Sequence, residues 1–228
     1  YLSGNMMMDR NLGAFNVYPT GMGAEFNGGY AEFGLYYQWG RKDPIVEIGN
    51  IVPEGVITTY PYDESKNYLE YSIHNPTEVI DDINWNDDRG LWGTRKTMYD
   101  PCPHGWRVPD KGVWDGWTAD AIPYGSNGIR IIAEPYSVPE AVFVMSGYGD
   151  YTYSLQNFHS CGYWWTNEPD SNLLMHWEYD MYFTNWDGSH RLSVRCMKDD
   201  QFTVETSGCD KVTATSAIVV GDIEIFDD

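Results

Sequence analysis

Apolar and polar side chains alternate most regularly between residues 173 and 183. The positions of one parity are all apolar or aromatic: Leu173, Met175, Trp177, Tyr179, Met181 and Phe183. The positions of the other parity are mostly polar: Leu174, His176, Glu178, Asp180 and Tyr182. Because successive side chains of a strand point to opposite faces, this pattern predicts one strand with a buried face and a mostly polar face.

A tight turn and a second strand are predicted directly after it. The segment NWDGSH (185–190) contains Asp187-Gly188, a pair that is typical of turns in β-hairpins. Alternation resumes in RLSVRCMKD (191–199), where Leu192, Val194 and Cys196 share one parity. We therefore expect a hairpin here, with Cys196 facing inward on its second strand.

Upstream of this hairpin the elements are shorter. Residues 32–44 predict a short strand that enters a turn at Asp43-Pro44, and the β-branched segments 128–133 and 141–148 predict two further strands. The polar stretch 46–98 is irregular, so we expect a long loop or an insertion there, with a short helix at most.

The composition supports short elements rather than long helices. With 23 Gly and 12 Pro, few windows are free of a chain breaker for the length of a long helix. A short helix is expected to begin near Asp110, a helix-capping residue that follows Pro109, and Gly112 and Gly116 limit its length. Aromatic residues make up 16% of the chain, which favours strands. We therefore expect a β-rich chain with long loops.

The chain is strongly acidic, with a formal net charge of −20. It would repel a phosphate backbone or an anionic membrane surface, so no nucleic-acid partner is expected. No run of about 18 apolar residues occurs, which predicts that the chain has no transmembrane segment. The opening YLSGNMMM reads like the middle of a protein, so we expect a mature or excised fragment, and the lack of a visible signal peptide does not argue for a cytosolic location.

Four cysteines are present, and none has the spacing of a zinc site: Cys102, Cys161, Cys196 and Cys209. Four cysteines allow three complete pairings, and the sequence pattern does not choose among them. Their even number favours an oxidising compartment.

Three segments occur in an order that carries a family resemblance: CPHGWRVPDKGVW (102–114), GYWWTNE (162–168) and SVRCMKD (193–199). Together with MMMDRNLGA (6–14) and GLYYQWGRKDP (34–44), they resemble the Fibrobacter major paralogous domain, a family of Bacteroidota surface proteins. That family is in turn similar to the C-type-lectin-like fold of the formylglycine-generating enzyme. The resemblance implies an α+β, C-type-lectin-like domain over residues 1–200, with twisted antiparallel strands, one or two short helices and much irregular loop.

The resemblance also implies a disulfide, because Cys102 and Cys196 match the two cysteines of the family. Cys161 and Cys209 lie outside the motifs, and either a second bridge or buried free thiols would account for them. After residue 200 the composition changes. Residues 201–228 are expected to be a linker and the start of an immunoglobulin-like module, and the alternative is a strand that packs back on the main domain.

No catalytic site is predicted. The similar formylglycine-generating enzymes need a closely placed cysteine pair to bind copper, and neither that pair nor a G-x-S-x-G or H-E-x-x-H motif occurs here. The five histidines are scattered along the chain: His74, His104, His159, His176 and His190. We therefore expect that the chain is not an enzyme and has no cofactor.

Calcium is the one metal for which the sequence offers candidate ligands. Glu168 and Asp170, followed by Asn185 and Asp187, are similar to the Glu-Pro-Asn and Trp-Asn-Asp pairs of calcium-dependent lectins, and calcium prefers such oxygens. The order Asn-Trp-Asp differs from the lectin order. That difference favours coincidence, in a chain rich in Asp and Asn, over a calcium site.

The segment 163–190 is dense in Tyr, Trp, Asn, Asp and Ser, which are residue types that suit ligand recognition. Trp164, Trp165 and Trp177 are expected in the core. The polar parity and the turn supply the ligand-binding candidates: His176, Glu178, Asp180, Tyr182, Asn185, Trp186 and Asp187. Trp186 is the leading candidate because we expect it to be exposed in the turn.

These features predict a non-catalytic recognition or adhesion module that is secreted or held at the outer-membrane cell surface. Its partner would be a glycan or a host or bacterial surface protein. Its setting would be a fimbrial tip or a multi-domain lipoprotein, beside other fimbrial or lipoprotein domains. The alternatives are a structural spacer or assembly domain without a ligand of its own and, with less support, a divergent enzyme on the same fold.

Overall fold

The computed structural model describes residues 5–15, 33–45, 59–61, 67–76, 78–81, 90–114, 118–120, 129–133, 141–150, 155–157, 160–169, 171–176, 181–186, 188–200, 203–210 and 218–224. This part of the chain is mixed α+β: it is mostly strand and loop, with one α-helix, α1 (Tyr68–His74), and one 3-10 helix, η1 (Lys111–Trp114). The α+β prediction is confirmed. Within these ranges, none of the helices has the length and apolar character that crossing a membrane requires.

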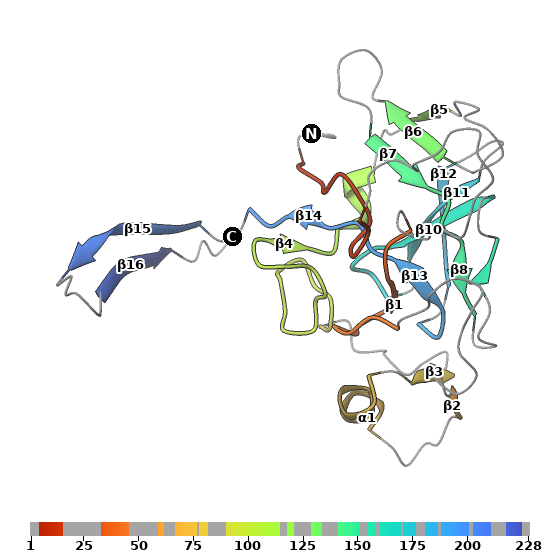
Figure 1. Cartoon of the computed structure of the whole chain (residues 1–228), viewed down its shortest axis with the longest axis horizontal. Coiled ribbons are helices and arrows are strands. Elements are labelled where there is room, and N and C mark those ends of the chain that lie inside the picture. The colour runs from red at the N-terminus through yellow and green to blue at the C-terminus, as the bar shows by residue number, and fades with distance from the viewer. Residues whose placement is uncertain are drawn as a thin grey trace.

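The main sheet of the described residues has seven strands: β1 (Tyr36–Gln38), β8 (Tyr148–Gly149), β9 (Leu155–Gln156), β10 (Cys161–Trp165), β11 (Asn172–His176), β12 (Met181–Thr184) and β13 (Arg191–Ser193). Six of them follow the order β12-β11-β10-β13-β8-β9, and β1 pairs with β13 (Figure 1). The pairing of β10 with β13 is parallel, whereas the other pairings in this sheet are antiparallel.

Smaller sheets surround the main one. An antiparallel sheet joins β5 (Thr118–Asp120), β6 (Ile129–Ala133) and β7 (Ala141–Val144). The strand predicted over 128–133 is confirmed, whereas the one predicted over 141–148 ends at Val144, and Tyr148 begins β8 of the main sheet. A second pairs β4 (Trp106–Arg107) with β14 (Met197–Lys198), and a parallel pair joins β2 (Thr59–Pro61) to β3 (Val79–Asp81). Helix α1 is the short helix expected in 46–98, and it lies beside β2 and β3 in Figure 1.

The prediction of a single strand over 173–183 is wrong. The segment forms two strands, β11 and β12, which pair antiparallel with Leu173 opposite Phe183 and Met175 opposite Met181. Each of these pairs joins residues of the same parity. Because directly opposed residues share a face of the sheet, the apolar parity still gathers on one face.

The predicted hairpin between 173–183 and 191–199 is also wrong. Strand β13 does not pair with β12, and instead lies beside β10, with Ser193 opposite Trp164. Residues 185–186 and 188–190, which connect β12 to β13, therefore lie across β11 and β10, and we call them the crossover segment. Cys196 is fully buried, as expected, but it lies between β13 and β14 rather than within a strand.

Both faces of the main sheet are buried. One face contributes to a first core cluster, which includes Tyr37, Trp39, Trp92, Tyr163, Trp165, Leu174, Leu192 and Val194. The other contributes to a second core cluster, which includes Trp114, Phe143, Met145, Trp164, Leu173, Met175 and Met197. The expectation that Trp164 and Trp165 are core residues is confirmed, and Trp177 lies outside the described residues.

Gly162 leaves the space that the Trp164 ring occupies. A Cβ atom at Gly162 would lie 2.1 Å from the nearest ring atom of Trp164. The ring cannot easily move, because its Nε1 donates to Asn11 Oδ1 at 2.8 Å and Phe143 packs edge-on against it. The close approach therefore requires glycine at position 162.

Gly162→Ala is expected to lower the free energy of unfolding by about 1–3 kcal/mol, because an overpacked core must displace well-packed side chains. Gly93→Ala is the matched control: there the nearest atom to the added Cβ lies at 3.5 Å, an ordinary contact. Urea unfolding of both variants measures the difference. Equal stability of the two variants would show that the Trp164 ring adapts freely.

The predicted bridge between Cys102 and Cys196 is confirmed, with 5.9 Å between the two Cα atoms. The bridge lies within the first core cluster. A second bridge from Cys161 to Cys209 is not formed, since Cys161 has a free, buried thiol. Of the two alternatives for Cys161, the structure shows the buried free thiol, which packs as a small apolar residue.

The C-terminal residues form an antiparallel hairpin of β15 (Thr203–Asp210) and β16 (Ile218–Glu224). In Figure 1 these two strands, drawn in blue, extend away from the main sheet. A two-stranded hairpin is marginal when it stands alone in water. Its extended position fits the expectation of a separate module after residue 200, which stays a prediction.

Candidate functional site

The motif segments that carry the family resemblance meet in space and bind one another. The Asp110 carboxylate accepts hydrogen bonds from Arg107 Nη2 and, at 2.6 Å, from Asn167 Nδ2. Arg107 also faces Asp199, with 3.9 Å between Nε and Oδ1. These residues come from all three motifs, so their polar groups hold the fold together. The short helix predicted to begin near Asp110 forms as the 3-10 helix η1, and the Asp110 carboxylate binds Arg107 and Asn167.

Asp100 organises the loop that carries the disulfide. Its Oδ1 accepts from the backbone N–H of Cys102 at 2.8 Å and from Lys96 Nζ at 3.1 Å, and its Oδ2 accepts from the N–H of Val108 at 2.9 Å. Burial raises the pKa of this carboxyl, although the hydrogen bonds and Lys96 oppose the shift. These contacts fix the loop around Cys102 and connect it to the strand that begins at Trp106.

The crossover segment carries the leading ligand-binding candidate, Trp186. Its ring stacks on Tyr163 of β10, with 4.5 Å between ring centroids and 28° between the ring planes. Tyr148 meets it edge-on at 4.3 Å, and His190 lies at 4.7 Å. We call Tyr148, Tyr163, Trp186 and His190 the crossover cluster. Trp186 was expected to be exposed in a hairpin turn; it is half-buried, because the segment crosses the sheet and the indole packs on β10.

Tyr182 and Asn185 lie close to the crossover cluster and are exposed. Tyr182 is opposite Leu174, which is opposite Tyr163, so the three side chains share one face of the sheet. Tyr182 is 49% exposed, and Asn185 is exposed directly before Trp186. The structure therefore brings three of the predicted ligand-binding residues, Tyr182, Asn185 and Trp186, to one region.

Of the other four predicted ligand-binding residues, the structure describes one, His176. His176 is half-buried at the end of β11, opposite Cys161, on the same face as Tyr163. Glu178, Asp180 and Asp187 lie outside the described residues. For them, the prediction of ligand binding stays a prediction.

The two tyrosines in the cluster both have a pKa above the ordinary value for a phenol. Burial raises the pKa of Tyr148, and nearby Asp150 adds to the shift. It also raises the pKa of Tyr163, although a hydrogen bond donated by Asn157 Nδ2 at 3.2 Å opposes this. Both phenols therefore stay neutral at physiological pH and keep their O–H groups as hydrogen-bond donors.

The structure describes two of the four candidate calcium ligands. Glu168 is exposed in the connection between β10 and β11, and Asn185 is exposed after β12. Asp170 and Asp187 lie outside the described residues. Among the residues that the structure does describe, no three His, Cys, Asp or Glu side chains gather into a metal site.

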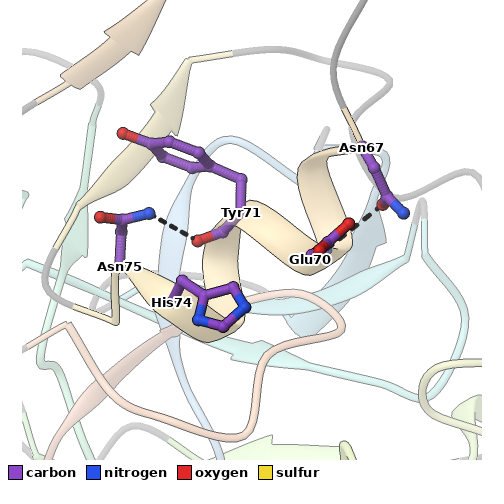
Figure 2. A pocket seen from close by; sticks show the side chains of 5 residues that line it. All are labelled: Asn67, Glu70, Tyr71, His74 and Asn75. Carbon is purple, nitrogen blue, oxygen red and sulfur yellow. Dashed lines mark hydrogen bonds between the residues drawn. The ribbon is translucent and has the colours of Figure 1, made fainter.

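An open pocket that was not predicted from the sequence lies on α1, with a volume of about 270 Å³. Figure 2 shows its lining side chains: Asn67, Glu70, Tyr71, His74 and Asn75. The spacing of these polar residues was visible in the sequence, because residues three and four apart lie on one face of a helix. It was missed because 46–98 was expected to be mostly loop.

Comparison of the chain with protein-family models, with curated proteins and with solved structures found no match. The resemblance to the Fibrobacter major paralogous domain therefore rests on the motifs alone and stays a prediction. The structure adds a physical reason for the motifs to occur together. Asp110 binds both Arg107 and Asn167, Arg107 also faces Asp199, and Cys102 is bonded to Cys196.

Proposed function

We propose that the chain is a non-catalytic recognition or adhesion module with a C-type-lectin-like fold, secreted or held at the cell surface. Its ligand is a glycan or a surface protein, and its setting is a fimbrial tip or a lipoprotein. The observation that carries the proposal is the aromatic region at the crossover segment. There a fixed Trp186 ring lies beside the exposed residues Tyr182 and Asn185.

The physical argument concerns preorganisation. Aromatic rings offer large rigid surfaces to a sugar ring or to an apolar side chain, and asparagine supplies adaptable hydrogen bonds. The crossover cluster already holds Trp186 in place, so little side-chain entropy is lost on binding. The net charge of −20 favours neutral or cationic ligands over anionic ones.

Tyr182→Ala is expected to weaken binding to a glycan and mucin array by about tenfold, since central aromatic residues dominate such interfaces. Tyr182 suits this test better than Trp186, because truncation of Trp186 would also remove packing against Tyr163 and Tyr148. Met98→Ala is the matched control: Met98 is 73% exposed and lies outside the crossover region. Equal binding by wild type and Tyr182→Ala would refute the site.

The alternative proposal is a spacer or assembly domain without a ligand. It is favoured by the C-terminal hairpin, which extends away from the main sheet (Figure 1). The same array separates the two functions. Absence of any binding by the wild-type chain would favour the spacer.

A further inference from the structure

Helix α1 is amphipathic and is fixed to the body of the protein. Tyr68 and Ser72 are buried, and Leu69 packs against the first core cluster. The buried Arg41, just after β1, donates through Nη2 to the carbonyl oxygens of Ser72 (3.3 Å) and Asn75 (3.1 Å) at the end of the helix. These bonds satisfy carbonyl groups that a helix end leaves unpaired.

A second buried side chain fixes the strand that follows α1. Gln38 Nε2 donates to the carbonyl oxygen of Ile80 at 3.0 Å, and Gln38 Oε1 accepts from its N–H at 3.1 Å. Arg41 and Gln38 also bind each other, with 2.9 Å between Nη1 and Oε1. The outer face of α1 is therefore presented on a fixed base, although α1 lies within the polar stretch 46–98.

The pocket on this outer face offers hydrogen-bonding groups of both kinds (Figure 2). Asn67 Oδ1 accepts from the N–H of Glu70, and Asn75 Nδ2 donates to the carbonyl oxygen of Tyr71. Among the described residues, Asn67 Nδ2 and Asn75 Oδ1 make no further hydrogen bond, so they can serve a ligand. The Glu70 carboxylate and the His74 imidazole are exposed at the same face. One donor, at least two acceptors and an imidazole thus line the helix side of this open pocket.

Tyr71 gives the pocket an aromatic wall that is held in place. Its Oη donates a hydrogen bond to Glu78 Oε2, which fixes the ring. This hydrogen bond raises the pKa of Tyr71 to about 12, so the phenol is neutral under physiological conditions. The ring offers an apolar surface beside the polar groups, a combination that a sugar ring can match with its C–H and O–H groups.

We infer that the α1 pocket is a second ligand site, which takes a single neutral sugar residue. Sugar hydroxyls both donate and accept, as the mixed lining requires. Glu70, Glu78 and the net charge of −20 disfavour an anionic ligand. The volume of about 270 Å³ is small for a ligand pocket and fits one ring better than an oligosaccharide. This site is separate from the crossover cluster and does not depend on ligand binding there.

The test is an NMR titration of the whole chain with three probes: methyl α-mannopyranoside, methyl β-galactopyranoside and methyl N-acetyl-β-glucosaminide. At least one probe is expected to shift the amide signals of residues 67–75 in a saturable way. Glu70→Ala and His74→Ala should each weaken that Kd by about tenfold, the effect of losing one hydrogen bond to a polar or charged group.

Ile73→Ala is the matched control, because Ile73 is 53% exposed on the same helix and does not line the pocket. It should leave the Kd unchanged. Saturable shifts confined to residues 182–190 would overturn this inference while supporting the proposed function. No saturable shift at 67–75 with any of the three probes would overturn it as well.

Discussion

Replacement of both Cys102 and Cys196 by serine is expected to lower the free energy of unfolding by about 4 kcal/mol. The bridge joins residues 94 positions apart, so it restricts a long loop of the unfolded chain. Both sulfur atoms also lie in the first core cluster, where serine hydroxyls would be buried. The large effect follows from the long loop and the burial together.

Urea unfolding with and without reductant measures this effect and contains its own control. Reductant should lower the midpoint of the wild-type chain and leave that of the double variant unchanged, because Cys161 has no bridge to break. An unfolding free energy that is the same in the wild type and the double variant would contradict the role assigned to the bridge.

Asn11→Ala is expected to lower the free energy of unfolding by about 3–5 kcal/mol, because several buried groups would lose their partner at once. Asn11 is 1% exposed. Its Oδ1 accepts from Trp164 Nε1 at 2.8 Å and from Arg195 Nε at 3.4 Å, and its Nδ2 donates to the carbonyl oxygen of Phe33 at 2.9 Å. Burial lowers the pKa of Arg195 to about 9, which shows how costly its charge is in this site.

Asn185→Ala provides the matched control for Asn11→Ala. It makes the same truncation at an exposed position and should change stability by no more than about 0.5 kcal/mol. Chemical denaturation of both variants gives the comparison. A cost at Asn11 as small as that at Asn185 would mean that water replaces the lost contacts.

The alternation over 173–183 located the strands but could not reveal the turn between them. In the β11–β12 register, Leu173 pairs with Phe183 and Met175 with Met181, so odd residues always face odd residues. A hairpin with this register continues the same alternation through its connection. The alternation of apolar and polar residues is therefore the same for one long strand and for two paired strands.

The partner of β13 could not be predicted because it depends on packing between distant residues. Asp187-Gly188 is a local turn signal, and local signals predict a hairpin between neighbouring strands. In the structure β13 pairs with β10 and β1, whose residues lie far away in the sequence. Trp186 consequently packs on Tyr163 instead of standing exposed in a turn.

The disulfide could be predicted from the sequence, whereas the α1 pocket could not. The pairing of Cys102 with Cys196 followed from the family resemblance, because four cysteines alone leave three pairings open. The pocket was not predicted, because it lies on one face of a helix in a stretch that was expected to be mostly loop. Arg41 and Gln38 make that face rigid, and nothing in the local sequence of α1 points to them.

In this protein, we propose, the motif residues hold the fold together while ligand recognition lies at the crossover segment. The most direct test measures binding to a glycan and mucin array for Tyr182→Ala and for Asn167→Ala, which removes a hydrogen bond to Asp110 in the motif network. Asn167→Ala is expected to lower stability and keep binding, whereas Tyr182→Ala should keep stability and weaken binding by about tenfold. Binding that survives Tyr182→Ala but is lost in a folded Asn167→Ala variant would contradict the account.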